Sequence, residues 1–469
     1  MGTNLFSYDT IYHMSELNTA ISTPMDMTDY KAMSSVKVSR VSIQPENTNS
    51  VELLGGNTSD VYFSIPSKGS TFLAGANSYL SFTYRLKGST QPAVAADPTA
   101  TPPVAEVAAG VAQICSGTGA SFIRNLETIA GSTSLELIQD YNAVACLVDD
   151  FQPANRKIKL GSILEDASTT QAKQGQSRSI AATTADGFTE KRRICLPLIS
   201  MVMGTTGDNY YPLNTDTGLR LRLTFEDPLI ALKSNLTTDA LKSGLGYILE
   251  DITYEAEYLT TDPSTYNAIV REAGGVMKVS GTGVSSFQTT VQAGSTKNTI
   301  LVPARYSSVR NYFTMMRPSN DVGGITAATK NSTGCRVRDN LEAYQYRIHG
   351  VPYPNLPVSV DAYTGAEAMC EVLKCFHSLH NTAQDIVVDK NYYTQNTSSD
   401  VRGAFVFGID FQEAGFSSQS MSGLSTNSGN TFIEMTHTEI CSDLTINTFC
   451  FFDQVIEIDT NSGEIMVSK

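Results

Sequence analysis

The sequence is poor in charge and in histidine, and it contains no tryptophan. Of its 469 residues only 17% are charged and five are histidine. Acidic residues outnumber basic ones by 47 to 33, so the net charge of −14 opposes binding to nucleic acid. The first 36 residues carry one base, Lys31, against four carboxylates. The chain therefore has no basic arm, and we expect no direct sequence-specific binding of nucleic acid.

Hydrophobic runs and paired cysteines are also missing. No stretch of 18 apolar residues and no basic-then-apolar leader occurs, so the sequence predicts neither a membrane span nor a secretory signal. Eight cysteines are scattered without a CxxC pair, and some lie in apolar stretches, such as Cys146 and Cys450. We interpret them as buried, reduced thiols. Four N-x-[ST] sequons are read as incidental; they begin at Asn57, Asn235, Asn331 and Asn396.

Motifs for catalysis or cofactor binding are absent as well. The sequence has no GxSxG, GxxxxGK[ST] or HExxH motif, and Gly281-Thr-Gly283 lacks the third glycine of a dinucleotide loop. One group has metal-ligand chemistry, but it lies on a predicted helix with an apolar stripe, so core or edge positions are favoured over zinc: Cys370, Cys375, His377 and His380. The adjacent carboxylates Asp149-Asp150 and Glu250-Asp251 point apart and are read as solvated surface. We predict no catalytic, cofactor or metal site, and no enzyme.

What the chain does contain is one helical pattern that occurs twice. Apolar residues recur at i, i+3, i+4 and i+7 in two short segments, which predicts helices at about 142–151 and 365–380. The offset between the segments is 369 − 144 = 225 residues. The two sets are Val144, Leu147, Val148 and Phe151, and Met369, Val372, Leu373 and Phe376. We interpret both stripes as core packing and not as a functional surface.

Strand-like sequence surrounds each predicted helix in the same order. Leu80–Leu86 and Leu219–Phe225 alternate strictly between apolar and polar residues, as half-buried strands do. Strands are also expected at Arg193–Val202 and at Ala404–Phe411. In the second half Val309–Met316 matches Leu80–Leu86 in place, and Tyr344–Ile348 and Pro357–Val360 bracket a proline-rich turn. Three long loop-like segments without hydrophobic periodicity, which we call excursions, interrupt the strands at 88–120, 161–190 and 318–340. Each half thus has about eight strands, with the helix between the fifth and the sixth.

This order predicts an all-β fold with an internal duplication. Eight antiparallel strands with one helix in a connection fit a jelly roll, so we predict two consecutive eight-stranded antiparallel jelly rolls, each with a short helix in one connection. The predicted units are an N-terminal arm at 1–35, a first jelly roll at 36–262 and a second at 263–469.

The order of elements resembles the double jelly-roll major capsid proteins of tailless icosahedral DNA viruses, in particular the polinton-like virus, virophage and adintovirus branch. The likeness spans about 36–460 and rests on short motifs in sequence order. They are Val41-Ser-Ile-Gln-Pro45, Phe63-Ser-Ile-Pro66, Asn77-Ser-Tyr-Leu-Ser-Phe82, Asp140-Tyr141-Asn142, Ile194-Cys-Leu-Pro-Leu-Ile199, Tyr211-Pro-Leu213, Tyr346-Arg-Ile348, Tyr353-Pro354, Phe407-Gly-Ile-Asp410 and Ser422-Gly423.

The resemblance implies a capsid protein that forms homotrimers, each a pseudo-hexameric capsomer of an icosahedral virion shell. It implies contacts with neighbouring capsomers and with penton and minor capsid proteins. The three excursions would then form the outer surface or the trimer contacts, and the arm at 1–35 would reach neighbouring capsomers or minor proteins. The implied location is the virion, assembled inside the host cell; an inner membrane stays open.

A different class of protein remains as the alternative. Two β-sandwich domains also suit a spike, a fibre or a glycan-binding surface protein. An enzyme on a jelly-roll scaffold needs clustered histidines and carboxylates, which the sequence does not show. Association distinguishes the first two classes, because a capsid protein forms trimers and arrays, whereas a stable sugar-binding monomer does not.

Overall fold

The computed structural model describes residues 36–88, 110–151, 178–180, 188–207, 210–214, 218–376, 388, 390–396, 403–412, 423–460 and 462–469. The predicted arm at 1–35 lies outside the described residues, as do most of the excursion at 161–190 and residues 89–109 of the excursion at 88–120. Among the described residues, no helix combines the length and the apolar character needed to cross a membrane.

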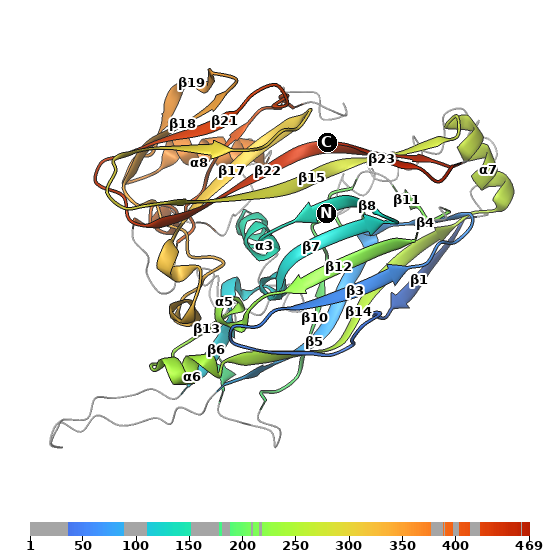
Figure 1. Ribbon diagram of the computed structural model, residues 1–469, viewed down its shortest axis with the longest axis horizontal. Helices are drawn as coiled ribbons and strands as arrows, with labels where there is room; N and C mark the ends of the chain where they lie inside the picture. Colours follow the sequence, from blue (N-terminus) through green and yellow to red (C-terminus); the bar gives the residue numbers. More distant parts are fainter. Residues whose placement is uncertain are drawn as a thin grey trace, which may run out of the picture.

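The first half is a jelly roll of two antiparallel sheets that enclose one core (Figure 1). One sheet has the order β10-β5-β14 with β1 paired to β14, and the other has the order β3-β12-β7-β8. The eight principal strands are β1 (Lys37–Ile43), β3 (Ser59–Ile65), β5 (Tyr79–Lys87), β7 (Ile123–Ala130), β8 (Thr133–Ile138), β10 (Arg192–Leu196), β12 (Leu219–Phe225) and β14 (Gly246–Thr260).

Shorter elements complete this half. The additional strands are β2 (Val51–Leu54), β4 (Thr71–Leu73), β6 (Val111–Ile114), β9 (Arg178–Ser179), β11 (Tyr211–Pro212) and β13 (Leu232–Ser234). The helices are α3 (Tyr141–Asp150), α5 (Pro228–Ala231), α6 (Asp239–Ser243) and α7 (Pro263–Glu272), with 3-10 turns at Gly75–Asn77, Cys115–Gly117 and Gly119–Phe122. Helix α7 leads into the second half.

The second half repeats the same topology. Its sheets have the orders β15-β22-β17-β20 and β16-β21-β18-β19. The strands are β15 (Val276–Val291), β16 (Lys297–Val302), β17 (Val309–Pro318), β18 (Leu341–Ile348), β19 (Val351–Ser359), β20 (Phe407–Asp410), β21 (Thr431–His437) and β22 (Leu444–Asp459), and β23 (Ile465–Ser468) pairs with β22. The helices are α8 (Ala366–Cys375) and α9 (Lys390–Tyr393), with 3-10 turns at Ser319–Asp321 and Ile325–Thr329.

The predicted all-β fold of two consecutive jelly rolls, each with a short helix in one connection, is therefore confirmed. In one sheet of each half the order is the same: β1, β14, β5 and β10 of the first jelly roll correspond to β15, β22, β17 and β20 of the second. In the other sheet the order β3, β12, β7 and β8 corresponds to β16, β21, β18 and β19. The cause is visible in β12, where every second residue from Leu219 to Phe225 is buried while Arg220 is exposed. Burying one such leucine contributes about 1.5–3 kcal/mol, so the alternation fixes which face turns inward.

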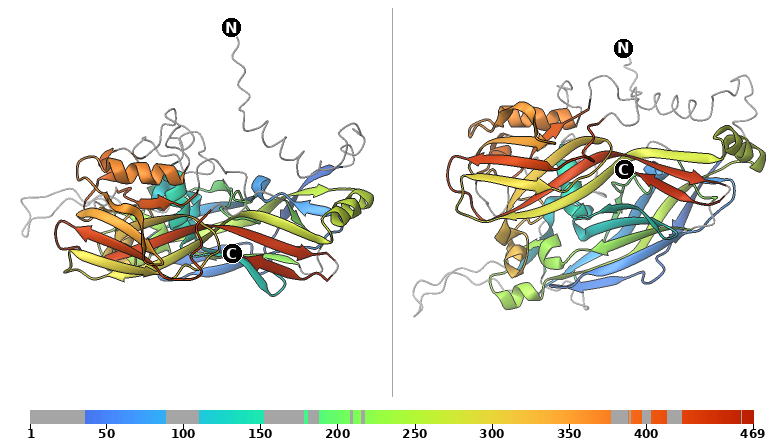
Figure 2. Two further views of the ribbon diagram at one scale, coloured as in Figure 1. Left: turned by 90° about the horizontal axis from the view of Figure 1, so that it is seen from above. Right: turned by 45° about the horizontal axis from the view of Figure 1, so that its top comes forward.

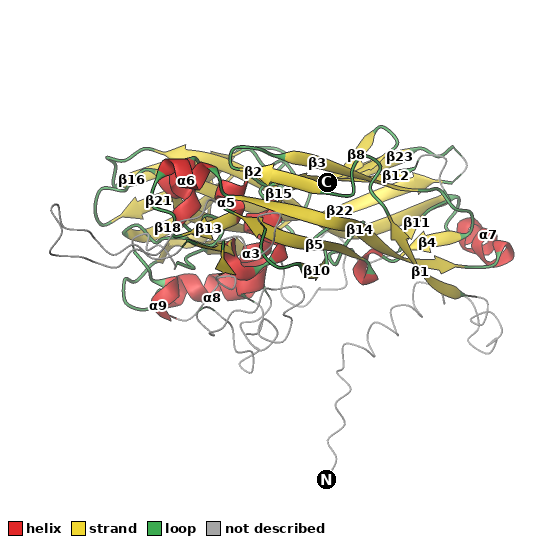
Figure 3. Cartoon of the chain, turned by 90° about the horizontal axis from the view of Figure 1, so that it is seen from below, coloured by secondary structure: helices red, strands yellow, loops and turns green. Residues whose placement is uncertain are grey.

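The repeated helix keeps its offset in the structure. Helices α3 and α8 begin at Tyr141 and Ala366, again 225 residues apart. Each follows a residue in the left-handed region, Asp140 at φ 49° and Gly365 at φ 56°. Both helices lie between the fifth and sixth principal strands, and both are found on the same side of the molecule (Figure 3). The duplication thus extends to the way each helix starts.

Two strand predictions were wrong. The segment read as a proline-rich turn is strand β19 itself, and the turn is confined to His349 and Gly350. A strand with three prolines is tolerated because β19 is the edge of its sheet, where no second neighbour needs its N–H groups. The strand predicted at Arg193–Val202 ends at Leu196, and residues 198–207 form turns that face the second jelly roll.

Strands of the second jelly roll reach across the first. The long strands β15 and β22, each of 16 residues, run over β7 and β8 toward α7 (Figures 1 and 2). Strand β8 packs directly against β15. The contact between the two jelly rolls is therefore an extended one, built from secondary structure on both sides.

Candidate functional site: the seam between the two jelly rolls

Side chains that could form a metal centre do not cluster within the described ranges. No group of three or more histidine, cysteine or acidic side chains there is arranged to hold a metal ion. In the predicted cluster Cys370 is exposed and Cys375 is buried, while His377 and His380 lie outside the described residues. All eight cysteines are free, and the reading as buried thiols holds for six of them, whereas Cys370 is exposed and Cys195 is partly exposed. Burial raises the pKa of Cys115 to about 12, so its thiol is unreactive.

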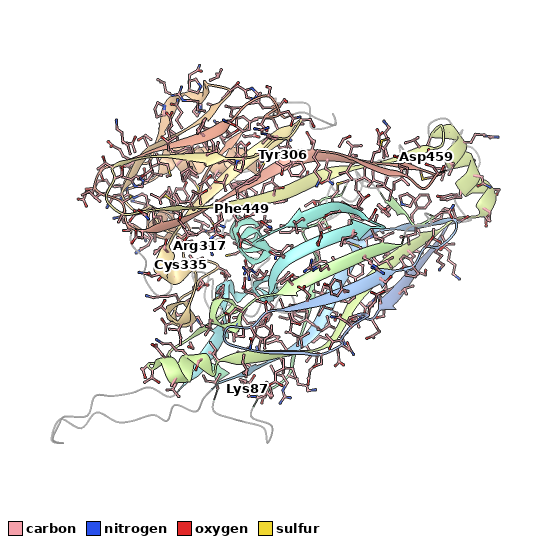
Figure 4. The ribbon with its side chains drawn as sticks, viewed as in Figure 1. Lys87, Tyr306, Arg317, Cys335, Phe449 and Asp459 are labelled. Carbon is pink, nitrogen blue, oxygen red and sulfur yellow. The ribbon has the colours of Figure 1, made fainter. Side chains whose placement is uncertain are left out.

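Polar side chains instead gather where the two jelly rolls meet, a contact that we call the seam. On the first jelly roll it comprises Ser116, β8, Asp140, α3, Phe151 and residues 198–207; on the second it comprises β15, Arg317, residues 328–336, Phe376 and β22. Figure 4 shows Arg317, Cys335 and Phe449 in this region, next to α3. The seam combines hydrogen bonds, an ion pair and an aromatic stack between the two jelly rolls.

Asp140 ties the start of α3 to two strands of the second jelly roll. Its Oδ2 accepts hydrogen bonds from Asn447 Nδ2 at 2.8 Å and from Ser286 Oγ at 3.2 Å. The oxygen of the Asn447 amide in turn accepts from Arg317 Nη2 at 2.8 Å, and Nη1 of that arginine donates to the carbonyl of Ser332 at 2.8 Å. The amide of Asn447 thus links the carboxylate of Asp140 in the first jelly roll to the guanidinium of Arg317 in the second through hydrogen bonds. Burial lowers the pKa of Arg317, while the nearby carboxylate of Asp140 opposes that change.

The other end of α3 is held by a buried ion pair. The carboxylate of Asp150 contacts Nη2 of Arg336, and both side chains are 0% exposed. Arg336 also donates to the carbonyl of Ala404 at 3.5 Å. A buried carboxylate needs such a partner, because an isolated charge in a dry environment is strongly disfavoured. The reading of Asp149-Asp150 as solvated surface was therefore wrong for Asp150, whereas Asp251 is exposed as expected.

An aromatic pair joins the last residues of the repeated pattern. The rings of Phe151 and Phe376 stack with their centroids 4.9 Å apart and an interplanar angle of 15°. Val144 and Leu147 are fully buried, which agrees with core packing. The interpretation of the whole stripe as core was nevertheless incomplete, since its final phenylalanine belongs to the contact between the jelly rolls. Equivalent residues of the two halves touch each other there.

Part of the excursion at 318–340 belongs to the seam and not to an outer surface. Asn331 Oδ1 accepts from the backbone N–H of Ser116 at 2.9 Å and from its hydroxyl at 3.2 Å. The hydroxyl of Ser116 also lies 2.8 Å from that of Thr333. The sequon at Asn331 is buried and engaged in this contact, in keeping with its reading as incidental. The excursion thus packs one jelly roll on the other.

Glu136 organises the remaining part of the seam. Its carboxylate accepts from Ser200 Oγ at 2.5 Å and from the backbone N–H of Met201 at 3.2 Å. The same turn reaches the second jelly roll, because the N–H of Thr282 donates to the carbonyl of Thr206 at 2.9 Å. Burial raises the pKa of Glu136 to about 7, and the two hydrogen bonds only partly offset this effect. Glu136 therefore titrates near neutrality while it holds a turn that bridges the seam.

Sequence reasoning missed most of these residues. The quoted motif Asp140-Tyr141-Asn142 does contain one seam residue, but it was read only as a helix start. Arg336 and Asn331 lie in a Gly/Thr/Asn-rich stretch whose composition suits a solvated loop equally well. Their burial depends on a contact between segments about 200 residues apart, which no local pattern records.

Comparison with solved structures identifies the fold. The Faustovirus major capsid protein aligns with 95% of this chain and 98% of its own, at a TM-score of 0.56 and 10% sequence identity. A chain of the Sputnik virophage structure, determined by cryo-EM, aligns with 92% of this chain and 88% of its own length, at a TM-score of 0.53 and 12% sequence identity. A chain of the PBCV-1 virus capsid aligns with 92% of this chain and 97% of its own length, at a TM-score of 0.53 and 9% sequence identity. Neither the family models nor the curated proteins give a match. The chain has the double jelly-roll fold of viral major capsid proteins.

Proposed function

We propose that this chain is a major capsid protein of an icosahedral virus and that its place is the virion shell. The observation that carries the proposal is the duplication: two jelly rolls whose principal strands share one order are joined by a buried seam. A block with two similar lobes makes three copies look six-lobed, which suits hexagonal positions of a shell. The likeness in fold to the Faustovirus and PBCV-1 proteins supports this assignment.

The proposed assembly unit is a homotrimer, a pseudo-hexameric capsomer. Within such a ring the contacts between chains are heterologous, because one patch on each chain meets a different patch on the next. We propose the lobes as 36–262 and 263–469 and the arm as 1–35, with the arm reaching neighbouring capsomers or minor and penton proteins. The net charge of −14 supports a shell that does not itself condense the genome.

Size-exclusion chromatography with light scattering tests the proposal on the full chain. A capsomer predicts a mass near 3 × 50.6 kDa. Raising the protein concentration or ionic strength is then expected to give hexagonal arrays or closed shells in negative stain. A stable monomer of 50.6 kDa that binds a glycan and never assembles would contradict the proposal and favour a spike or glycan-binding protein.

A further inference from the structure

A turn of the first jelly roll is bound to the first strand of the second. We call this turn, residues 198–207, the clasp; its Gly207 forms an antiparallel bridge with Gly281 of β15. Beside the bridge the N–H of Thr282 donates to the carbonyl of Thr206 at 2.9 Å. A Cβ on Gly281 would lie 2.7 Å from the oxygen of that carbonyl, so a glycine is needed for this close approach. The first glycine of the incomplete glycine motif therefore serves the contact between the jelly rolls.

The start of the clasp is held by one buried carboxylate. Glu136 is 2% exposed and accepts from the hydroxyl of Ser200 at 2.5 Å and from the N–H of Met201 at 3.2 Å. The oxygen of the Ser200 hydroxyl in turn accepts from the N–H of Met203 at 3.0 Å. The carbonyl of Ser200 accepts from the N–H of Thr206 at 3.2 Å. Hydrogen bonds thus connect Glu136 to the residue of the clasp that reaches β15.

Glu136 has no direct counter-ion in the part of the chain that the structure describes. The two groups that contact its carboxylate are neutral, a hydroxyl and a backbone N–H. The nearby cation is Lys469, directly after β23, and this ammonium favours the ionised carboxylate without a hydrogen bond to it. The other titratable neighbour is Tyr141 of α3, whose pKa is raised by burial, so its phenol stays neutral. A carboxylate in such a site is costly to ionise, whereas water stabilises its charge once the site opens.

We propose that the clasp is operated by a proton: it is closed on β15 while Glu136 is protonated, and it opens locally to water when the carboxylate ionises. The inference goes beyond the proposed function, because it concerns the two jelly rolls of one chain and holds whether or not chains associate. The clasp opens without the rest of the seam, since the ion pair of Asp150 and the contacts of Asn331 lie at other places along it. The pH thus determines how firmly one jelly roll is held to the other at this turn.

Ionisation of Glu136 favours the open clasp by an amount that its two pKa values determine. In the closed clasp its pKa is about 7, and in water the pKa returns toward the ordinary value of 4.5. Between these two values the opening of the clasp releases a proton, so the open fraction rises by up to about tenfold for each pH unit. From pH 5 to pH 7 the increase is up to about 100-fold, and above about pH 8 it stops because Glu136 is ionised in both states.

Hydrogen–deuterium exchange of the full chain, read by mass spectrometry of its peptides, measures this opening. The amide of Thr282 reports on the clasp, because its N–H is bonded to Thr206. Its protection factor, corrected for the pH dependence of exchange in an unfolded peptide, is expected to fall by up to about 100-fold from pH 5 to pH 7. The amide of Ser116 is the internal control, because it donates to Asn331 at 2.9 Å elsewhere in the seam. Its protection factor is expected to stay constant.

Two variants make the role of the proton specific. Glu136→Gln has a side chain of the same shape that does not ionise, so the protection of Thr282 is expected to be independent of pH in this variant. Lys469→Met removes the cation that favours the ionised carboxylate, so the upper end of the pH dependence is expected to move to higher pH.

Three results would overturn the proposal. Constant protection of Thr282 in the wild type means that the clasp does not respond to the proton, and an equal decline in Glu136→Gln means that Glu136 is not the responding group. An equal decline at Thr282 and Ser116 means that the whole seam opens as one unit. None of these results depends on the association of chains, so the capsid proposal is tested separately by its own measurement of mass.

Discussion

Replacing Asp150 by alanine removes the anion of the buried ion pair at the end of α3. Arg336 is 0% exposed, and its Nε and Nη1 find no acceptor among the described residues, so its charge then has no counter-ion in a dry seam. Removing one partner of such a pair costs about 3–5 kcal/mol. We expect Asp150→Ala to lower the free energy of unfolding by this amount in urea titrations. Because the pair joins the two jelly rolls, their transitions are expected to separate.

Two variants make this prediction specific. Asp150→Leu combined with Arg336→Met removes both charges, so much of the loss is expected to be recovered. Asp239→Ala removes a solvent-exposed partner of Lys242, 3.1 Å away, and is expected to cost less than about 1 kcal/mol. The reasoning is refuted if Asp150→Ala unfolds at the same urea concentration as Asp239→Ala, or if the double variant is no more stable than the single one.

Three further outcomes follow from the seam. Phe151→Ala removes the ring stacked on Phe376 and leaves a cavity, so a loss of about 3–5 kcal/mol is expected in urea unfolding; a loss below 1 kcal/mol would contradict the stack. Gly403→Ala places a Cβ 2.0 Å from the backbone oxygen of Arg336 and is expected to lower the melting temperature, whereas an unchanged melting curve would argue against this close approach. The pKa of Glu136, about 7 against an ordinary 4.5, means that its ionisation opposes folding, so its contribution is fully present below pH 4.5 and is lost as the pH rises through about 7. Unfolding measured from pH 4.5 to 8 is expected to show up to about 3 kcal/mol of this dependence in the wild type and none of it in Glu136→Gln, and equal slopes would refute it.

The sequence allowed the fold to be predicted because its signals are local. Strict alternation at Leu219–Phe225 and the repeated helical spacing both reflect burial against a nearby core. Strand β19 escaped prediction because its prolines resemble a turn, and only its place at a sheet edge makes them acceptable. The proposed boundary between 262 and 263 stays a prediction that proteolysis or separate expression of the halves can examine.

The seam was beyond local reasoning for a different physical reason. Asp150 and Arg336 are charged residues that a sequence places in water by default, and their burial becomes favourable only when the two halves bring them together. The same holds for Glu136, whose hydrogen-bond partners lie more than 60 residues away. Conversely, the predicted lack of a catalytic site came from missing motifs, and it stays a prediction.

Negative-stain imaging of the purified full chain tests the central claim most directly. The account predicts top views with six lobes in a ring, from particles of mass near 3 × 50.6 kDa, and the same unit repeated in any array that forms. Two-lobed particles of 50.6 kDa at every protein concentration would contradict it.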